Sequence, residues 1–579
     1  MRPLRLALAQ INPTVGDFEG NVSKIINYIE GSVKAGAQLV VFPELAITGY
    51  PPEDLLLKTH FIEDNLEALR KVQKKVKDII AVVGFVDRTD DIYNAAAIIY
   101  NKKLVGTCHK MYLPNYGVFD ELRYFQAGRR CAVYRIGDVC FGVNICEDIW
   151  YPEGPARMQA LAGAEVIINI NASPYRIGKN KFRENMLSTR ASDSIAIVVY
   201  LNTIGGQDEL VFDGDSLILD ENGNVGARGK PFKEDLVIAD LDLDPVRMKR
   251  LHAPRRRQEV VKLEKDAVEE IVIPVEEKLD KERTLPLLPS VGYKALEPME
   301  EVYEALVLGT SEYVRKNGFK GVVIGQSGGI DSSLVSTIAA DAVGRENVTG
   351  LFMPSPYTSK ESKEDVFSLA NNLGIEVVEV PIHSIFKSYL DALKEIFRGL
   401  PENVTEENIQ ARIRGNILMA FSNKFGRLVL TTGNKSEMSV GYATLYGDMA
   451  GGFAVIKDVS KTMVYELCRW KNKREGRVVI PDRVIRKEPS AELKPNQKDT
   501  DTLPPYSLLD PVLRAYIEDD KGVDEILSLG CEAESVKKII RMVDTSEYKR
   551  RQAPPGIKIT QRAFGRDRRF PITNKYRGY

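Results

Sequence analysis

The sequence predicts an α/β protein with at least two domains, and three observations carry this prediction. The chain has 579 residues, which is too long for a single hydrophobic core. Short apolar runs rich in β-branched residues alternate with helix-like segments in both halves of the chain. The glycine-rich stretch GQSGGIDSS (325–333) lies between an apolar run and a helix-like segment. Strand, turn and helix in this order are typical of α/β domains.

The first domain is predicted over residues 1–245. Its apolar runs are nearly continuous, as expected of strands buried on both faces. Several runs end in glycine or polar turns, so we expect a mixed sheet. The predicted strands are LRLALAQ (4–10), AQLVVFPE (37–44), IIAVVGFV (79–86), CFGVNICED (140–148), AEVIINI (164–170) and IAIVVYLN (195–202).

Residues 246–296 are predicted to connect the two domains. The segment is highly charged, as in RRRQEVVKLEKDAVEE (255–270), and continues into the proline-containing TLPLLPS (284–290). High charge and proline without apolar periodicity indicate a connecting arm and linker.

The second domain is predicted over residues 297–579. A helix over 298–318 leads into the apolar run GVVIG (321–325) and the glycine-rich stretch. Strand and helix then alternate through VTGLFMP (348–354), a helix from Ser359 and IEVVEVPI (375–382). This alternation predicts a doubly wound sheet with the glycine-rich loop after its first strand. The pattern weakens past about residue 480, where the tail is rich in arginine, lysine and proline.

The loop at 325–333 predicts a phosphate site. Backbone N–H groups of such a turn and of the following helix N-terminus point to one place, where an anion is stabilised. Gly328 and Gly329 permit close approach of the backbone, and Ser327, Ser332 and Ser333 add hydroxyl donors. The loop is neither a Walker A loop nor a GxGxxG dinucleotide loop. The plain alternative is an ordinary glycine turn.

Composition excludes several classes of protein. The net charge is −1, so no overall field favours nucleic acid or an anionic membrane. No apolar run reaches 18 residues, and the N-terminus lacks a signal-peptide pattern. The six cysteines form no CxxC motif, which favours a reducing cytoplasm. Only four histidines occur, so histidine-based metal or triad chemistry is poorly supplied.

Three reactive side chains in the first domain follow predicted strands. Glu44 lies in VVFPELAITGY, Lys110 in VGTCHKMYLPNYG and Cys146 in FGVNICEDIW. A cysteine nucleophile needs a base, which a glutamate supplies, and a cation, which a lysine supplies. Taken singly, each residue has a plainer interpretation: a buried cysteine, a solvated lysine and a capping glutamate. If they converge, they form a candidate site for a cysteine nucleophile that requires no histidine.

These motifs resemble two known families. The order Glu44, Lys110, Cys146 is similar to the nitrilase superfamily of amidases, which implies an α-β-β-α sandwich over about 1–245 and makes Glu121 a second catalytic glutamate. The 325–333 loop resembles that of the N-type ATP pyrophosphatases, which adenylate a substrate and release pyrophosphate. Over nearly its full length the chain resembles the glutamine-dependent NAD synthetases, through GYPPEDL (49–55), QARIRG (410–415), TTGNKSE (431–437), GYATLYGDMAGGFAVIKDV (441–459) and EYKRRQAPPG (547–556).

The resemblance implies a ligase that converts nicotinate adenine dinucleotide, ATP and glutamine to NAD, AMP, pyrophosphate and glutamate. Glu44 would be the general base, Lys110 the oxyanion partner and Cys146 the nucleophile. Residues that would hold glutamine are Tyr116, Ser173 and Lys179. Residues that would contact ATP are Gly325, Gln326, Ser327, Gly328, Gly329, Ile330, Asp331, Ser332, Thr432, Lys461 and Ser490. Residues that would contact the dinucleotide are Asn408, Glu437, Asp448 and Lys549.

The resemblance also implies that Asp331 and Glu437 bind Mg²⁺, which prefers hard oxygen ligands. The expected partners are the three small-molecule substrates and further copies of the chain, as a dimer or a higher homo-oligomer. On spacing alone, Lys461 and Lys549 would read as members of surface salt bridges.

Other functions remain open at the level of the sequence. An amidotransferase that makes GMP or a thiolated tRNA base would share the glycine-rich loop. The tRNA enzyme would be expected to carry a basic face or extra cysteines, and the GMP enzyme a Cys-His-Glu glutaminase. A non-catalytic scaffold with a nitrilase fold would have no need of Glu44, Lys110 and Cys146.

Overall fold

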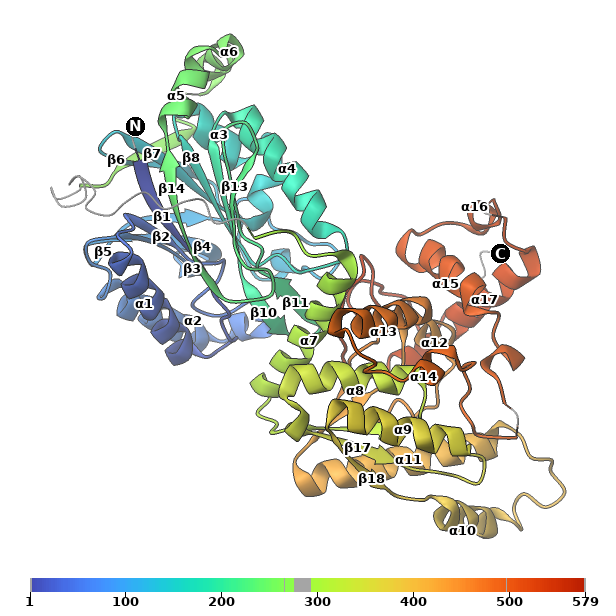
Figure 1. Ribbon diagram of the computed structural model, residues 1–579. Helices are drawn as coiled ribbons and strands as arrows, with labels where there is room; N and C mark the ends of the chain where they lie inside the picture. The colour runs from blue at the N-terminus through green and yellow to red at the C-terminus, as the bar shows by residue number, and fades with distance from the viewer. Residues whose placement is uncertain (1–2, 265, 275–292, 496, 529, 577–579) are drawn as a thin grey trace. The chain divides into compact units, whose positions relative to one another are not determined.

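A computed structural model describes residues 3–264, 266–274, 293–495, 497–528 and 530–576 (Figure 1). The chain divides into two compact units. The first runs up to Gln207 and from Val211 to Leu296, and the second comprises Asp208–Leu210 and the chain from Glu297 onward.

The first unit contains two large sheets. The six-stranded sheet has the order β14-β1-β2-β3-β4-β5, and the seven-stranded sheet has the order β13-β12-β9-β8-β7-β6-β15. Strands of the first sheet are β1 (Pro3–Gln10), β2 (Leu39–Val41), β3 (Ile80–Arg88), β4 (Ile92–Tyr100), β5 (Lys103–His109) and β14 (Asp235–Asp242). Strands of the second are β6 (Cys131–Ile136), β7 (Val139–Ile145), β8 (Val166–Asn171), β9 (Ile197–Asn202), β12 (Leu217–Leu219), β13 (Val225–Arg228) and β15 (Val268–Val272). A hairpin of β10 (Ile204–Gln207) and β11 (Leu210–Asp213) adds a small third sheet.

Successive side chains of each strand point to opposite faces of its sheet, and this alternation produces the layers of the unit. In β1, Leu6 and Leu8 face the core between the two sheets, whereas Ala7 and Ala9 face outward. The outward face of the six-stranded sheet packs on α1 (Phe18–Lys34) and α2 (Thr59–Gln73). The outward face of the other sheet packs on α3 (Pro155–Leu161) and α4 (Lys179–Ser194). The result is the expected α-β-β-α sandwich, because apolar residues of period two bury both faces of each sheet.

Both sheets are mixed, as predicted. β2 pairs in parallel with β1 and β3, whereas β3 and β4 are antiparallel. In the second sheet β7, β8 and β9 are parallel neighbours, and β6 pairs with β7 in the antiparallel direction.

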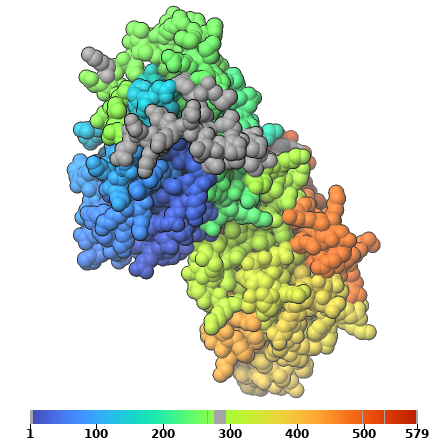
Figure 2. Space-filling model, turned by 60° about the vertical axis from the view of Figure 1, so that its left-hand side comes forward, coloured from blue at the N-terminus to red at the C-terminus, as the bar shows by residue number. Residues whose placement is uncertain are grey.

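The first half of the expected connecting arm is folded. Residues 244–262 form α5 (Asp244–Leu251) and α6 (Pro254–Lys262), and β15 pairs in parallel with β6 at the sheet edge. The helix α6 buries none of its side chains and lies at the outside of this unit (Figures 1 and 2). Its polar surface explains why its sequence lacks apolar periodicity. Residues 275–292, with the proline-containing segment 284–290, lie outside the described residues.

The second unit is built on a parallel sheet of five strands in the order β18-β17-β16-β19-β20. Its strands are β16 (Val322–Gln326), β17 (Val348–Phe352), β18 (Glu376–Glu379), β19 (Leu428–Thr431) and β20 (Phe453–Ala454). The first strand, β16, lies between β17 and β19. The chain first adds β17 and β18 on one side of β16, and later adds β19 and β20 on the other side. Ligands of doubly wound sheets bind at the carboxyl end of such a switch point.

Helices cover both faces of this sheet. The side chains of β16, β17 and β19 pack on α10 (His383–Leu393) and α11 (Val404–Phe425) on one face. The helices α8 (Ile330–Val343) and α9 (Lys360–Leu373) contact the strands elsewhere, and α7 (Pro298–Lys316) and α13 (Lys461–Glu475) pack on α8. The doubly wound arrangement predicted from the sequence is confirmed.

The C-terminal part adds short helices with a core of their own. They are α12 (Lys435–Val440), α14 (Asp482–Arg486), α15 (Tyr506–Leu513), α16 (Val523–Leu527), α17 (Ala533–Thr545) and α18 (Glu547–Arg550). Val440 of α12 packs with α15, α16 and α17. These C-terminal helices therefore pack against α12 and support it; α12 follows β19 at the carboxyl edge of the sheet.

Gly84 of β3 allows the turn after β2 to approach the sheet. A Cβ at this position would collide with the Pro43 carbonyl oxygen and lie 2.5 Å from the Leu45 nitrogen. We expect Gly84→Ala to destabilise the fold by about 1–3 kcal/mol, because backbone must shift to admit the methyl group. Urea unfolding followed by circular dichroism measures the change.

The matched control is Gly226→Ala in β13, where the nearest atom to the new Cβ is the Ile218 carbonyl oxygen at 3.7 Å. This variant is expected to unfold like the parent. An unchanged urea midpoint for Gly84→Ala would contradict the prediction.

Candidate active sites

The first site contains a buried lysine between two carboxylates. The Lys110 ammonium lies 2.7 Å from Glu44 Oε1 and 2.8 Å from Glu121 Oε1. The side chains of Glu44 and Lys110 are fully buried and that of Glu121 nearly so. Burial lowers the pKa of Lys110, but the charges of Glu121 and Glu44 outweigh it and raise this pKa well above its usual value. Lys110 is therefore a permanent cation in an apolar setting.

Cys146 lies in a left-handed turn directly after β7, with φ of +47°. A non-glycine residue in this region costs roughly 1–3 kcal/mol, so the turn is strained. Burial, and then the negative charge of Glu44, raise the pKa of the Cys146 thiol, while Lys110 lowers it. At rest the sulfur is protonated, and it needs a base before it can attack a substrate.

The sandwich brings the three residues together from both sheets. Glu44 follows β2 and Lys110 follows β5 in the six-stranded sheet, whereas Cys146 follows β7 in the other. Each residue thus follows the end of a strand, where the backbone is free to turn; β2 and β7 are buried strands, whereas β5 is partly exposed.

Several supporting contacts could not be predicted from the sequence. The amide of Asn94 donates to Glu44 Oε1 at 2.7 Å, and the backbone N–H of Ala172 donates to Glu44 Oε2 at 2.8 Å. The hydroxyl of Tyr50 donates to Glu121 Oε1 at 3.0 Å. Burial raises the pKa of Glu121 to about 7; the charge of Lys110 opposes this rise and that of Glu44 adds to it. Asn94 sits within an otherwise apolar strand sequence, YNAAAIIY, which is the one local hint of its role.

Each of the three residues expected to hold glutamine has a hydrogen-bond partner within the first unit. The hydroxyl of Tyr116 lies 3.0 Å from both carboxylate oxygens of Glu147, the neighbour of Cys146. The Ser173 backbone N–H donates to Asn202. Lys179 begins α4 and donates to the Pro174 carbonyl at 2.8 Å. Burial, and next the charge of Arg183, lower the pKa of Lys179 to about 7, while Cys146 raises it.

The second site lies at the carboxyl end of β16, where the glycine-rich loop enters α8. The Ser327 and Ser332 hydroxyl oxygens are 3.1 Å apart, and the Gly329 N–H donates to Ser327 Oγ at 3.2 Å. Gly328 has φ of +79°, and a Cβ there would lie 2.6 Å from the Ser362 carbonyl oxygen, so only glycine fits. The loop turns sharply and leaves its serines beside the helix N-terminus.

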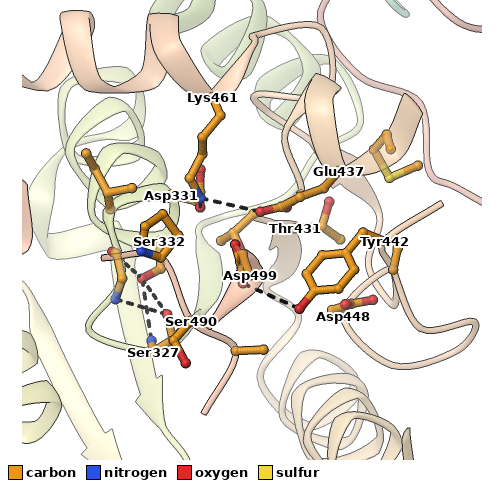
Figure 3. A pocket seen from close by; sticks show the side chains of 18 of the residues that line it. Ser327, Asp331, Ser332, Thr431, Glu437, Tyr442, Asp448, Lys461, Ser490 and Asp499 are labelled. Atoms are coloured by element: carbon orange, nitrogen blue, oxygen red, sulfur yellow. Dashed lines mark hydrogen bonds and ion pairs between the residues drawn. The ribbon is translucent and has the colours of Figure 1, made fainter. Parts of the chain in front are cut away.

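A buried lysine also organises this second site (Figure 3). The Lys461 ammonium forms an ion pair with Asp331 and lies 3.4 Å from Glu437 Oε1. Burial lowers the pKa of Lys461, but the charges of Asp331 and Glu437 outweigh it and raise this pKa. Burial raises the pKa of Glu437 to about 8, Lys461 opposes this, and Asp331 adds to it.

Two adjoining cavities open beside this cluster. The first is lined by Ser327, Gly329, Ile330, Asp331, Ser332, Thr432, Glu437, Asp448, Lys461 and Ser490 among others. The second is lined by Gly325 and Gln326, and by the apolar side chains of Phe352, Met353 and Leu418. The first cavity is therefore strongly charged, whereas the second offers apolar walls of the kind that a flat aromatic ring packs against.

Three predicted residues, Gly328, Asn408 and Lys549, are not among those that line these two cavities. Asn408 accepts a hydrogen bond from Thr444 Oγ1 at 2.8 Å, and Lys549 donates to the Gly441 and Ala443 carbonyls at 2.7 and 2.9 Å. Both contact the 441–448 segment, which ends at Asp448.

No pattern in the sequence indicated Asp499, a further carboxylate of the first cavity. It accepts a hydrogen bond from the Tyr442 hydroxyl at 3.4 Å (Figure 3). The Tyr506 hydroxyl donates a second one at 2.8 Å. Burial raises the pKa of Asp499, and Lys461 lowers it. Its place in a weakly patterned tail explains why it could not be predicted.

Comparison with known proteins assigns a family to each unit. Residues 5–250 match the carbon-nitrogen hydrolase family and residues 302–553 the NAD synthase family. Glutamine-dependent NAD(+) synthetases of Thermotoga maritima and Aquifex aeolicus are 50% and 48% identical to the chain, covering 100% and 99% of it and 100% of each relative. The solved glutamine-dependent NAD+ synthetase of Acinetobacter baumannii, in complex with ADP, is 42% identical over 100% of both chains, with a TM-score of 0.74.

Fold and sites together define an amidase of the carbon-nitrogen hydrolase class joined in one chain to an ATP-dependent synthetase unit. The chain belongs to the family of glutamine-dependent NAD(+) synthetases. Among the described residues, no helix is long and apolar enough to cross a membrane.

Proposed function

We propose that the chain makes NAD by amidating nicotinate adenine dinucleotide, with ATP as the energy source and glutamine as the nitrogen donor. One observation carries this proposal: the buried Glu44–Lys110 pair beside Cys146 and the Asp331–Lys461–Glu437 cluster beside a glycine-rich loop occur in one chain. Full-length identity to the family supports the same pairing of activities.

The amidase unit releases ammonia from glutamine. Glu44 takes the proton of the Cys146 thiol as the sulfur attacks the carboxamide carbon, and Lys110 stabilises the negative charge that develops on the oxygen. Glu44 then passes the proton to the leaving nitrogen, and a glutamyl thioester remains until water hydrolyses it. The raised pKa of the Cys146 thiol supports a step in which base and nucleophile act together.

Glu121 keeps the Lys110 ammonium in place through its 2.8 Å contact. Around the sulfur, Tyr116, Ser173 and Lys179 hold the amino-acid end of glutamine. The contact between Tyr116 and Glu147 supports this assignment for Tyr116. The charge interaction of Lys179 with Cys146 supports a place for Lys179 near the substrate.

The synthetase unit binds ATP and activates the nicotinate carboxylate as an adenylate. Residues 325–332 receive the phosphates, because the serine hydroxyls and the N-terminus of α8 present donors there. Lys461, Thr432 and Ser490 line the same charged cavity and contact ATP. The apolar walls of the adjoining cavity suit the adenine ring.

Asp331 and Glu437 would hold Mg²⁺. The donor set fits this ion, since two carboxylates supply hard oxygen ligands and the phosphates of ATP supply more. Both carboxylates already share one cation, the Lys461 ammonium. Bound there, Mg²⁺ would supply positive charge that offsets the charge of a departing pyrophosphate. Lys461 lines the same cavity, where its ammonium can pair with a phosphate oxygen.

The dinucleotide substrate is held by Asn408, Glu437, Asp448 and Lys549 in this proposal. The contacts of Asn408 and Lys549 with the 441–448 segment support a common site around that segment. Burial raises the pKa of Asp448 to about 6, so it carries charge at neutral pH.

The chain is proposed to act in the cytoplasm as a homo-oligomer, with no nucleic-acid partner. Several large apolar side chains between residues 385 and 419 are exposed, and a second copy that covered them would remove apolar surface from water. They are Ile385, Tyr389, Ile396, Leu400 and Met419. The net charge of −1 supports the absence of a nucleic-acid role.

The acceptor substrate is tested by AMP release. The purified protein, supplied with ATP and glutamine, is expected to form AMP when nicotinate adenine dinucleotide is the acceptor, and none above background when xanthosine monophosphate is the acceptor. Liquid chromatography of nucleotides measures both reactions. Formation of AMP with xanthosine monophosphate but not with nicotinate adenine dinucleotide would refute the proposed acceptor.

The nitrogen donor is tested by Cys146→Ala. This variant is expected to lose NAD formation from glutamine and to keep formation from ammonium chloride, because the adenylation site is unchanged. Glu44→Gln and Lys110→Ala should behave alike, since residues of one catalytic unit fail together.

The matched control is Cys140→Ala, which removes the same atoms from a buried position within β7. It is expected to retain synthesis from glutamine. Glutamine-dependent activity in Cys146→Ala would rule out Cys146 as the nucleophile.

The metal site is tested by Asp331→Ala and Glu437→Ala. Both variants should lose NAD formation with glutamine and ammonia alike, because adenylation precedes either amidation. A loss of about 100-fold or more is expected from removing a group that stabilises transition-state charge. Asp341→Ala serves as the control, since Asp341 lies on the same helix and pairs with Lys471. Loss of glutamine-dependent activity alone would contradict the assignment.

A further inference from the structure

Asp148 lies two residues after Cys146 and joins two loops through backbone hydrogen bonds. Its side chain is fully buried. One carboxylate oxygen, Oδ1, accepts the N–H groups of Met111 and Tyr112 at 3.0 and 2.9 Å. The other, Oδ2, accepts the N–H of Ile145 at 3.0 Å.

These three amides flank two of the proposed catalytic residues. Met111 directly follows Lys110, and Ile145 directly precedes Cys146. The strands that carry Lys110 and Cys146, β5 and β7, belong to different sheets. No strand pairing therefore fixes the ends of these two strands relative to each other, whereas the Asp148 carboxylate connects them through charge-assisted hydrogen bonds.

Two side-chain contacts nearby also cross between the sheets: Cys108 Sγ lies 3.1 Å from the Val143 carbonyl oxygen, and Glu44 accepts from the Ala172 N–H. Two backbone contacts of Lys110 and Cys146 lie within one sheet each. The Lys110 N–H donates to the Asn94 carbonyl at 2.8 Å, within the first sheet. The Cys146 carbonyl accepts a long bond of 3.4 Å from Asn169, within the second. Cys146 also has a left-handed backbone, which persists only where neighbouring contacts enforce it. Asp148 supplies a contact that spans both sheets and holds this turn.

The choice of a carboxylate here has a physical reason. Two oxygens without a proton accept from opposite directions, whereas an asparagine would turn an N–H₂ group toward one of the backbone donors. Burial raises the pKa of Asp148 to about 7, and the amides of Ile145, Tyr112 and Met111 lower it, as does the charge of Lys110. Burying a carboxylate beside a nucleophile is costly in free energy. The need for two acceptor oxygens, one for each loop, explains why Asp148 is found there.

We propose that Asp148 is a positioning residue that sets the place of the Lys110 ammonium relative to the Cys146 sulfur, and so controls the rate of thioester formation. Asp148 touches no reacting atom and acts through the backbone on either side of the two residues. The proposal rests on the amidase function proposed above.

The experiment compares Asp148→Ala and Asp148→Asn with the parent enzyme in the full chain. Because a displacement of about 1 Å can cost about 100-fold in rate, kcat for glutamine hydrolysis should fall by about that factor in the alanine variant. The asparagine variant keeps one acceptor oxygen and should lose less. KM for glutamine should change little, and NAD formation from ammonium chloride should be retained. Alkylation of Cys146 by iodoacetamide, followed by mass spectrometry of its peptide, should slow in the same order.

The control is Asp240→Asn. Asp240 is a buried carboxylate that pairs with Arg5 at 2.9 Å, at the opposite end of the parallel strands β1 and β2 from Glu44. This variant should keep the parent kcat and alkylation rate.

Several outcomes would overturn the role of Asp148: an unchanged kcat in Asp148→Asn, a change confined to KM, or an equal loss of kcat in Asp240→Asn. If Asp148→Ala does not fold, the asparagine variant decides. A parent enzyme that hydrolyses no glutamine would instead refute the amidase function itself, which separates the two failures.

Discussion

The first unit depends on keeping a lysine ammonium charged in a place that water does not reach. An isolated ammonium in such a place would lose its proton or move to the surface, because burial of an unpaired charge is too costly. Glu44 and Glu121 prevent this by contacting Lys110 at 2.7 and 2.8 Å. Removing one partner of a buried pair leaves an uncompensated charge, at a cost of about 3–5 kcal/mol.

The second unit uses the same pairing with a different consequence. Lys461 also lies between two carboxylates, Asp331 and Glu437, but these line an open cavity rather than the closed interior of a sandwich. A further cation and an anionic ligand can therefore enter the cavity and form new ion pairs with Asp331, Glu437 and Lys461. The buried cluster of the first unit suits chemistry on one bound substrate, whereas the accessible cluster suits the arrival and departure of charged phosphates.

Features with a local physical cause could be predicted from the sequence. Continuous apolar runs identified the buried strands, and the glycine-rich turn between β16 and α8 predicted a candidate anion site, where only glycine admits the close approach at Gly328. The proposed catalytic residues were singled out because each follows a predicted strand. Strand ends are the places where a buried element can present a reactive side chain.

Features that depend on distant chain segments could not be predicted. Asn94 contacts Glu44 from 50 positions along the chain, and Asp148 contacts Met111 from 37 positions away. No local sequence pattern indicates that residues so far apart in the chain will contact each other. Asp499 lies in a tail without clear periodicity and reaches the cavity because α12 and α15 pack together. The strand β15 was also missed, since a charged edge strand such as VEEIV lacks the apolar run of a buried one.

The resting state of Cys146 links the fold to its chemistry. A thiol with a raised pKa reacts slowly with oxidants and adventitious electrophiles, because the thiolate is the reactive form. Glu44 already accepts bonds from Lys110, Asn94 and the Ala172 amide, so the proposed base is oriented before a substrate arrives. The same burial that protects the sulfur strengthens every charge interaction around it. In the proposed mechanism, proton transfer and attack would therefore be coupled to the binding of a carboxamide whose developing oxyanion the Lys110 ammonium would stabilise.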